Sequence, residues 1–512
     1  MNPWRGMRRA QLIVACGLLL VSAWLLWPAS SRAQGDQWAK TYGWSSSEVA
    51  WSVGLTSDGG CVVAGWTYSS GAGEADFWAL KLRADGTVEW KKTYGGPGWE
   101  WADLISQTDD GGYALTGETT SFGAGGGDVW ALKLDAGGEV QWEKAFGGRA
   151  DDLAVSMLQT QDGGYVVAGE TKSFGAGDWD AWVLKLDATG GVQWQKTYGG
   201  TGWDSSSADP IEQTTDGGYV LTGRTSSFGA GGFDIWVLKL DADGAIQWQK
   251  TYGGYADDEA HAIRQTADGG YAVAGFTRSF GAGGLDVWVL KLDASGAVQW
   301  QETLGGRDGD RCWSVCATSD GGCIIAGDTA SYGAGAHDVW MLKLSADGTL
   351  QWQRTYGGHQ SEWGEAVRQT ADGGYYVAGG TQSFGVGYTD LWVLKLDPQG
   401  RIPGCALGVS SDATIRYTEV TGVDCNAVPA DSDAIVTVSQ ATVRESAAVV
   451  HTQCKAGPTA TPTHTRTPTH TLTPTTTRTP TRTRTATRTQ VPTRTPTGLP
   501  HLYLPLVVKQ YS

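Results

Sequence analysis

The chain has 512 residues, of which 75 are glycine and 26 are tryptophan, and its formal net charge is −16. This length exceeds a single ordinary core unless the core is built from repeats. The charge is unevenly spread: residues 1–33 carry +4 and residues 455–512 carry +8, which leaves −28 on residues 34–454. So acidic a body repels nucleic acid, and we expect no nucleic-acid partner.

The N-terminal segment, residues 1–33, is predicted to be a signal peptide. It begins with three arginines, continues with an apolar run from Leu12 to Trp27 and ends with small residues at the positions that a signal peptidase reads. A lipoprotein box at Cys16 is disfavoured, because most of the apolar run follows this cysteine. No later apolar run is long enough to cross a bilayer. We therefore expect a secreted or cell-surface mature chain without a transmembrane helix.

Residues 34–400 contain one unit written seven times. The D-G-G turns recur in steps of 52 residues, with one step of 54, and their aspartates are Asp58, Asp110, Asp162, Asp216, Asp268, Asp320 and Asp372. Each unit reads as four short strands separated by Gly-rich or Asp-Gly turns, as in DGGYAVAGFTRSFGAGGLDVWVLKLD. Four-stranded units repeated radially form a β-propeller, so we predict an all-β fold with seven blades.

The two ends of this region predict how the ring closes. Residues 37–43, QWAKTYG, match the fourth strand of a unit but have no first three strands before them. The seventh unit departs from the pattern after DLWVLKLDPQG and lacks its own fourth strand. We expect the N-terminal strand to complete the seventh blade, which removes two exposed edges. We expect a monomer.

The pattern T-Y-G-G, T-x-D-G-G-Y, A-G-x-T-x-S-F-G-A-G, D-x-W-x-L-K-L and Q-W covers residues 37 to about 397. It resembles the bacterial seven-bladed β-propeller repeat of secreted and surface proteins, and more loosely kelch and quinoprotein blades. The resemblance implies a propeller fold and an extracellular setting. Members of this family share no single reaction, so the resemblance implies no particular activity.

Three further segments follow the repeats. Residues 401–456 are rich in Val, Thr, Ala and Ser and contain three cysteines, which predicts a small β module. Residues 457–498 are almost entirely Thr, Pro and Arg, which predicts a disordered stalk. Residues 499–512 form a short apolar tag that is too short to span a bilayer and resembles the closing tag of some exported bacterial proteins.

Removal of the signal peptide leaves seven cysteines in an expected oxidising compartment. Cys316 and Cys323 flank one D-G-G hairpin and are predicted to bridge its strands. Cys405 paired with Cys454 would close the largest loop of the small module. This pairing leaves Cys425 without an assigned partner.

An acidic residue follows each T-Y-G-G segment in register: Glu48, Glu100, Asp152, Asp204, Asp258, Asp310 and Glu362. Their loops are expected at one end of the ring, where seven carboxylates could form an acidic rim. The structural alternative is that each carboxylate caps the first strand of its blade. No D-x-D-x-D-G loop supports a calcium site. We predict no metal site and no cofactor, with calcium as the alternative.

Nine tryptophans lie outside the repeat anchors and the signal peptide, and seven of them lie between T-Y-G-G and D-G-G: Trp44, Trp51, Trp99, Trp101, Trp203, Trp313 and Trp363. These positions vary from blade to blade. The stretch GWEWAD at 98–103 alternates aromatic rings with carboxylates, a mixture that suits sugar rings. The predicted ligand-binding residues are Trp44, Trp99, Glu100, Trp101, Asp103, Trp203 and Trp363. The alternative is that these indoles fill gaps between loops.

The sequence contains no nucleophile elbow, zinc-spaced histidine cluster or phosphate loop, so enzymatic chemistry has little support. The favoured interpretation is a non-enzymatic module that binds an extracellular glycan or a surface protein through the face bearing the variable tryptophans and carboxylates. Two alternatives stay open. One is a structural envelope or display module without a ligand, and the other is a glycan-active or quinone-dependent enzyme.

Overall fold

The computed structural model describes residues 37–405, except the side chains of residues 207–209, and the backbone of seven short strands between residues 408 and 455. All of these residues belong to one compact unit, Met1–Pro458. The predicted signal peptide (1–33), stalk (457–498) and C-terminal tag (499–512) lie outside the described residues. In the part of the chain that is described, no helix is long and apolar enough to cross a membrane.

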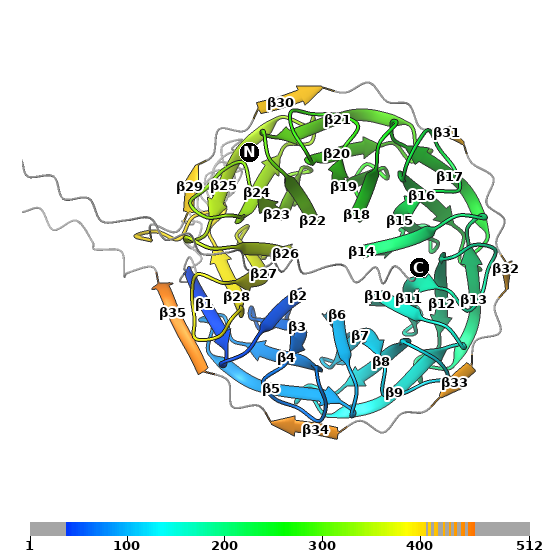
Figure 1. The fold of residues 1–512 in the computed structure, drawn as a ribbon, viewed down its shortest axis with the longest axis horizontal. Coiled ribbons are helices and arrows are strands. Elements are labelled where there is room, and N and C mark those ends of the chain that lie inside the picture. The colour runs from blue at the N-terminus through cyan, green and yellow to red at the C-terminus, as the bar shows by residue number, and fades with distance from the viewer. Residues whose placement is uncertain are drawn as a thin grey trace, which may run out of the picture. The chain divides into compact units, whose positions relative to one another are not determined.

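The predicted seven four-stranded blades are confirmed, and Figure 1 shows them arranged around an axis with the first strand of each blade innermost. The inner strands are β2 (Glu48–Leu55), β6 (Glu100–Gln107), β10 (Asp152–Gln159), β14 (Asp204–Gln213), β18 (Asp258–Gln265), β22 (Asp310–Ala317) and β26 (Glu362–Gln369). The second strands are β3 (Cys61–Thr67), β7 (Tyr113–Thr119), β11 (Tyr165–Thr171), β15 (Tyr219–Thr225), β19 (Tyr271–Thr277), β23 (Cys323–Thr329) and β27 (Tyr375–Thr381).

The outer half of each blade completes the sheet. The third strands are β4 (Asp76–Leu82), β8 (Asp128–Leu134), β12 (Asp180–Leu186), β16 (Asp234–Leu240), β20 (Asp286–Leu292), β24 (Asp338–Leu344) and β28 (Asp390–Leu396). The fourth strands are β5 (Val88–Gly95), β9 (Val140–Gly147), β13 (Val192–Tyr198), β17 (Ile246–Tyr252), β21 (Val298–Gly305), β25 (Leu350–Tyr356) and, from the N-terminus, β1 (Trp38–Gly43). Blades 1 to 6 therefore begin at β2, β6, β10, β14, β18 and β22, and blade 7 combines β26, β27, β28 and β1.

The predicted closure of the ring is confirmed. Strand β1 pairs antiparallel with β28, and Trp38 lies opposite Lys395. The indole nitrogen of Trp38 donates a 3.1 Å hydrogen bond to the carbonyl of Ala84 in blade 1. The equivalent bond between blades 1 and 2 joins Trp90 to the carbonyl of Ala136 at 3.0 Å. The junction that joins the two chain ends is thus built like the others.

The core lies between neighbouring blades and is built from the repeated aromatic residues. Trp130 of β8 is fully buried, and its ring lies 4.7 Å from Phe77 of blade 1 and 5.2 Å from Phe122 of its own blade. The hydroxyl of Tyr94 donates a 2.7 Å hydrogen bond to the carbonyl of Gly138 in the next blade. Large rings at each junction therefore provide both apolar burial and interblade hydrogen bonds.

The D-G-G turn places a carboxylate at the entrance of every second strand. Asp110 accepts hydrogen bonds from Thr108 at 2.6 Å, from the amide of Gly112 at 3.0 Å and from Lys133 at 2.9 Å. Burial raises the pKa of Asp110, but these hydrogen bonds outweigh it and lower the pKa to about 2. Gly111 adopts a φ of 80°, a conformation that favours glycine.

The strands described after the propeller do not form the compact module predicted for 401–456, because each one pairs with the fourth strand of a different blade. They are β29 (Gly408–Ser410) on β25, β30 (Thr414–Tyr417) on β21, β31 (Val423–Asp424) on β17, β32 (Ala430–Asp431) on β13, β33 (Ile435–Thr437) on β9, β34 (Thr442–Glu445) on β5 and β35 (Val449–Lys455) on β1. We call this segment the outer belt; its strands follow the periphery in Figure 1. The fourth strands would otherwise present unpaired edges, which the belt covers.

The predicted bridge between Cys316 and Cys323 is wrong, since both are free thiols. Cys316 lies opposite Ile324, and Cys323 lies opposite Ala317. Neighbouring residues of a strand point to opposite faces, so the two sulfurs are directed to different blade junctions. Cys323 packs between blades 5 and 6, whereas Cys316 packs between blades 6 and 7.

Candidate functional site

The seven carboxylates predicted to form an acidic rim are all fully buried. We call them the carboxylate ring. Asp152 accepts hydrogen bonds from the amide of Gly148 at 2.6 Å, from the Ser173 hydroxyl at 2.7 Å and from the Thr171 hydroxyl. It thereby links the loop before its strand, the second strand and the S-F-G-A-G loop. The carboxylate ring therefore belongs to the internal hydrogen-bond network of the blades and is not a ligand-binding surface. The prediction of Glu100 as a ligand-binding residue is wrong, because its side chain is buried in this network.

The aspartates of the D-x-W motif form a second buried set beside this ring. Asp128 accepts backbone hydrogen bonds from Ala124 and Gly125 at 3.1 and 3.2 Å. Burial raises the pKa of Asp128 to about 6 despite these hydrogen bonds, and the nearby charge of Asp152 adds to the rise. Across the described residues, no three His, Cys, Asp or Glu side chains converge to hold a metal ion. Both sets of carboxylates thus serve the blades themselves.

A β-bulge interrupts every inner strand near its beginning. In blade 2 the register shifts between Ala102 and Leu104, which leaves Asp103 without a partner residue in the next strand. The same shift occurs in the other six blades. The bulged residues are Trp51, Asp103, Val155, Ser207, His261, Trp313 and Glu365, and we call them the bulge ring. In blade 4 the bulge spans residues 207–210, so it takes up the additional residues of the longer repeat.

The bulge ring differs in character from blade to blade, unlike the carboxylate ring beside it. Bulges re-aim side chains and are frequent next to functional sites. The residue two positions earlier on each inner strand lies opposite the variable residue of the A-G-x-T motif, as with Trp101 and Glu118 in blade 2. These three positions in each blade, together with the neighbouring loop residues that pack against them, form one set of variable side chains next to the axis of the ring, which we call the variable face.

In blades 1 and 2 the variable face is aromatic and acidic. Trp66 and Tyr68 lie 4.8 Å apart, Tyr68 and Trp99 lie 6.1 Å apart, and Trp99 and Trp101 lie 5.5 Å apart. The Trp99 side chain is 38% exposed. Burial, and then the charge of Glu118, raise the pKa of Asp103 well above its usual range. The structure thus brings together three of the predicted residues, Trp99, Trp101 and Asp103.

In blades 3 to 5 the variable face contains stacked cations and rings. The rings of Trp203 and Trp179 are stacked, with centroids 6.2 Å apart and planes inclined by 24°. The guanidinium of Arg224 lies 4.8 Å from the Trp203 ring and 4.6 Å from the Phe233 ring. It also forms a 2.9 Å ion pair with Glu259 of blade 5. The predicted residue Trp203 therefore belongs to a sector separate from that of Trp99.

In blades 5 to 7 the variable face is a polar cluster that our sequence reasoning missed. Trp313 donates a 2.6 Å hydrogen bond to Asp328, which also accepts a 2.8 Å hydrogen bond from the Nδ1 of His337. The ring of His261 lies 4.8 Å from that of Trp313. Glu365 lies on the neighbouring inner strand. The signal was present in the sequence, because x of A-G-x-T takes six different residue types in the seven units.

The two other predicted residues, Trp44 and Trp363, differ in place, because Trp44 lies in the core whereas Trp363 occupies a variable-face position of blade 7 opposite Gly380. Trp44 packs against the core residue Trp78 at 5.1 Å. In the other blades the phenylalanine or tyrosine of the S-F-G-A-G loop packs against the equivalent tryptophan, as Phe174 does on Trp182. Blade 1 has Ser70 at this position, so Trp44 fills the space. Trp363 lies over Gly380 of blade 7, where an added Cβ would lie 3.3 Å from its ring.

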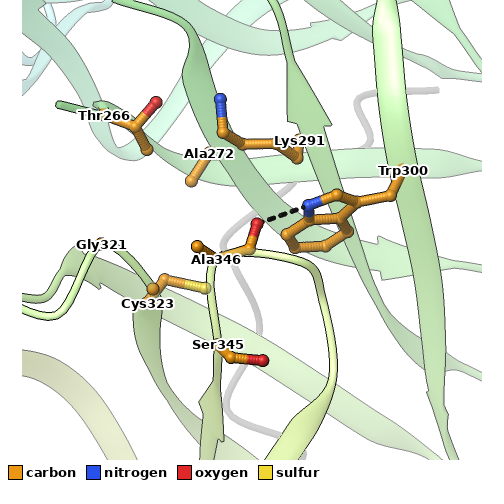
Figure 2. Close-up of a pocket in the computed structure, with 9 residues that line it drawn as sticks. Thr266, Ala272, Lys291, Trp300, Gly321, Cys323, Ser345 and Ala346 are labelled. Atoms are coloured by element: carbon orange, nitrogen blue, oxygen red, sulfur yellow. Dashed lines mark hydrogen bonds between the residues drawn. The ribbon is translucent and has the colours of Figure 1, made fainter. Parts of the chain in front are cut away.

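One small cavity lies between blades 5 and 6, lined by residues that include Thr266, Lys291, Trp300 and Cys323 (Figure 2). Its volume of 10 Å³ holds at most one water molecule. Trp300 donates a 3.0 Å hydrogen bond to the carbonyl of Ala346 beside it. This cavity is a packing gap at a blade junction and is too small for a ligand.

No model of a known protein family matches the chain. The regulatory protein FlaEY of Caulobacter vibrioides is 27% identical over 191 residues, which cover 34% of this chain and 20% of FlaEY. Puromycin hydrolase is 16% identical with a TM-score of 0.40, over 73% of this chain and 54% of the hydrolase. Sqt1 from Chaetomium thermophilum, bound to the N-terminus of ribosomal protein L10, is 12% identical with a TM-score of 0.37, over 70% of this chain and 98% of Sqt1. These similarities carry no functional argument.

Proposed function

We propose that this β-propeller is a non-enzymatic binding module that holds an extracellular glycan or a surface protein on its variable face. One observation carries the proposal: in all seven blades variable residues gather at the inner-strand bulges, whereas the carboxylate ring and the D-x-W tryptophans, which are common to all blades, are buried in the scaffold. A scaffold needs the same side chains in every blade. A ligand of lower symmetry needs different side chains in different blades.

The chemistry of blades 1 and 2 supports a glycan. Trp99 and Tyr68 are 38% and 40% exposed, and their rings lie nearly perpendicular at 6.1 Å. Exposed indole and phenol rings offer flat apolar surfaces for the C–H faces of a sugar, while Asp103 and Glu118 supply polar groups for its hydroxyls. The same mixture suits a protein partner less well, because protein interfaces are depleted in acidic side chains at their centre.

An extracellular location is part of the proposal. It is supported by the charged, apolar and small-residue order of residues 1–33 and by the Thr- and Pro-rich segment 457–498. Such a segment would hold the propeller away from the surface to which the chain is attached.

The two alternative functions have less support. A display module without a ligand would leave the variable face featureless, with its tryptophans turned inward, yet Trp99 is 38% exposed. A glycan-cleaving enzyme would need accessible carboxylates, but the seven carboxylates of the carboxylate ring are fully buried and engaged within their blades.

The test is a binding panel of immobilised glycans probed with the secreted protein and with the double variant Trp99→Ala/Trp101→Ala. We expect the wild-type chain to bind a subset of glycans without converting them and the double variant to lose that binding. The matched control is Trp90→Phe, which changes a repeated tryptophan far from the variable face. Binding that survives the double substitution, or that depends on Trp90, would contradict the proposal.

A further inference from the structure

His261 in the bulge of blade 5 is a buried polar side chain that lacks a hydrogen-bond partner within the described residues. Its side chain is 4% exposed, and its ring lies 4.8 Å from that of Trp313 and 5.2 Å from that of Phe276. Burial lowers the pKa of His261 to about 3, and the charges of Arg224 and Arg311 add to this effect. The imidazole is therefore neutral at physiological pH, with one N–H donor and one acceptor unused.

Arg311 lies two residues before Trp313 on the same inner strand, so both side chains share one face of the blade. Within the described residues its guanidinium makes no hydrogen bond and no ion pair. The carboxylate opposite it, Asp328, already accepts hydrogen bonds from Trp313 and His337. Burial raises the pKa of Glu365 to about 8, the charge of Asp328 adds to the rise and the charge of Arg311 opposes it, so at neutral pH Glu365 is mainly uncharged. Arg311 thus keeps its N–H donors available.

Arg224 provides a contrast within the same chain. Its guanidinium forms a 2.9 Å ion pair with Glu259, donates a 3.2 Å hydrogen bond to Ser205 and stacks on Trp203. Its donors are therefore engaged inside the protein. Arg311 has a comparable position near the axis but no such partners, and a half-buried guanidinium in that state is poised to accept an acidic group from outside.

We infer that Arg311 and His261 form a subsite for the carboxylate of an acidic sugar. The guanidinium can donate a parallel pair of hydrogen bonds to a carboxylate, and the N–H of His261 can donate a third. Phe276 and Trp313 form the apolar wall beside it. An acidic sugar fits better than an acidic peptide because the variable face also exposes the Trp99 and Tyr68 rings. This inference rests on the proposed function and names the ligand class.

The test compares D-glucuronate with the neutral methyl glucoside by isothermal titration calorimetry on the full-length secreted chain. We expect wild-type protein to prefer glucuronate and Arg311→Gln to weaken glucuronate binding by about tenfold to a hundredfold, the effect of losing charge-assisted hydrogen bonds. Arg311→Lys should bind with intermediate affinity. The control is Arg368→Gln, which removes a guanidinium near the far end of inner strand β26, where it bonds the carbonyl of Val367, and should change nothing.

Several outcomes would overturn the subsite. Equal binding of the two sugars by the wild-type protein would do so, as would an Arg311→Gln variant that keeps its preference for glucuronate. A glutamate-rich peptide that binds more tightly than glucuronate, in an Arg311-dependent way, would overturn the sugar assignment. Wild-type protein that binds only neutral glycans through Trp99 would overturn this inference and leave the proposed function intact, whereas a chain that binds nothing would overturn both.

A second inference rests on a different observation, the disulfide bond of Cys405. Cys61, Cys312, Cys316 and Cys323 are free thiols, so the partner is Cys16, Cys425 or Cys454. Cys405 packs against the cluster between blades 6 and 7 that includes Ala39.

The outer belt places two of these candidates at different blades. The backbone of Cys454 lies opposite Ala39 in blade 7. Cys425 directly follows β31, which pairs with blade 4. The two cysteines of a disulfide need Cα atoms within about 7 Å. The structure assigns Cys454 as the partner of Cys405, so the outer belt forms a covalent hoop around the seven blades.

Peptide mapping under non-reducing conditions tests the hoop, together with melting curves of Cys405→Ser, Cys454→Ser and the control Cys425→Ser. We expect a peptide linking Cys405 to Cys454 and a lower melting temperature for the first two variants only, because opening the hoop releases a loop of the unfolded chain from its constraint. A peptide that links Cys405 to Cys425, or equal melting of all three variants, would overturn the assignment.

Discussion

The carboxylate ring and the bulge ring lie on the same inner strands, three residues apart, yet they behave in opposite ways. Asp152 and its six equivalents are fully buried and bonded to their own blade. The bulge ring instead presents indole, carboxyl, aliphatic and imidazole side chains in turn. Repetition in this fold therefore marks what each blade needs for folding, and variation marks what the assembled ring can use for binding.

The largest effect is expected from removing the strand that closes the ring. Deletion of residues 34–43 removes β1 and the fully buried Trp38, and it exposes the edge of β28. The loss of one buried indole alone costs about 3 to 5 kcal/mol. We expect aggregation or a much lower melting temperature by calorimetry, whereas deletion of residues 457–512 should leave melting almost unchanged. Equal melting of the two truncated chains would show that closure does not depend on β1.

A single methyl group between the two sets of buried carboxylates should have the next largest effect. A Cβ at Gly147 would lie 1.8 Å from Oδ1 of Asp128 and 3.0 Å from Oδ2 of Asp152. Gly147→Ala is therefore expected to lower the free energy of unfolding by about 1 to 3 kcal/mol, the usual cost of overpacking. Denaturant titration measures it. The matched control is Gly284→Ala, because a Cβ there meets nothing within 4 Å. A similar loss of unfolding free energy in both variants would show that crowding of Asp128 and Asp152 is not its cause.

Trp44 sharpens the comparison, since it varies in sequence but packs in the core. Trp44→Ala should destabilise the protein by up to about 3 kcal/mol, at the lower end for a large aromatic residue, and should leave glycan binding unchanged. Adding Ser70→Phe should restore part of the stability, because the other blades have an aromatic residue at that position. Thermal melting measures both variants. If Trp44→Ala kept normal stability but lost glycan binding, Trp44 would be a ligand-binding residue and not a core residue.

The smallest effect is a dependence of stability on pH with opposite signs at two sets of aspartates. The pKa values of Asp128, Asp180 and Asp234 are raised to about 6, mainly by burial, so the folded state gains protons and stability as pH falls through 6. The pKa values of the D-G-G aspartates are lowered, as that of Asp110 is to about 2, so their contribution is lost as pH falls below about 4.

Together, the raised pKa values of the first set of aspartates and the lowered pKa values of the D-G-G aspartates predict maximum stability between about pH 4 and pH 6. His261 opposes the gain in stability at lower pH. The unfolded chain binds one proton at this histidine near pH 6.5, whereas the buried imidazole of the folded chain stays neutral. The D-G-G carboxylates are half exposed, so salt should weaken their contribution. Melting temperatures from pH 3 to pH 8 test the prediction, and a steady fall in stability from pH 8 to pH 5 would contradict it.

The fold could be predicted from the sequence because the same strand and turn pattern recurs seven times. The single fourth strand at residues 37–43, which has no first three strands before it, indicated how the ring closes. The carboxylate ring could not be placed, since a polar residue at a loop end can face inward or outward with the same spacing. The cluster of His261 and Arg311 was missed because bulges depend on strand register. The outer belt was missed because its partners are strand edges more than 40 residues distant, which no local pattern reveals.

The most direct test of the division between repeated and variable residues is one thermal-shift assay, with and without the panel glycans, on wild-type protein, Trp99→Ala/Trp101→Ala and Gly147→Ala. We predict that the tryptophan variant melts close to the wild type but shows no ligand-induced shift, and that Gly147→Ala melts lower but keeps the shift. A tryptophan variant that keeps the shift, or a Gly147→Ala variant that loses only the shift, would contradict the account.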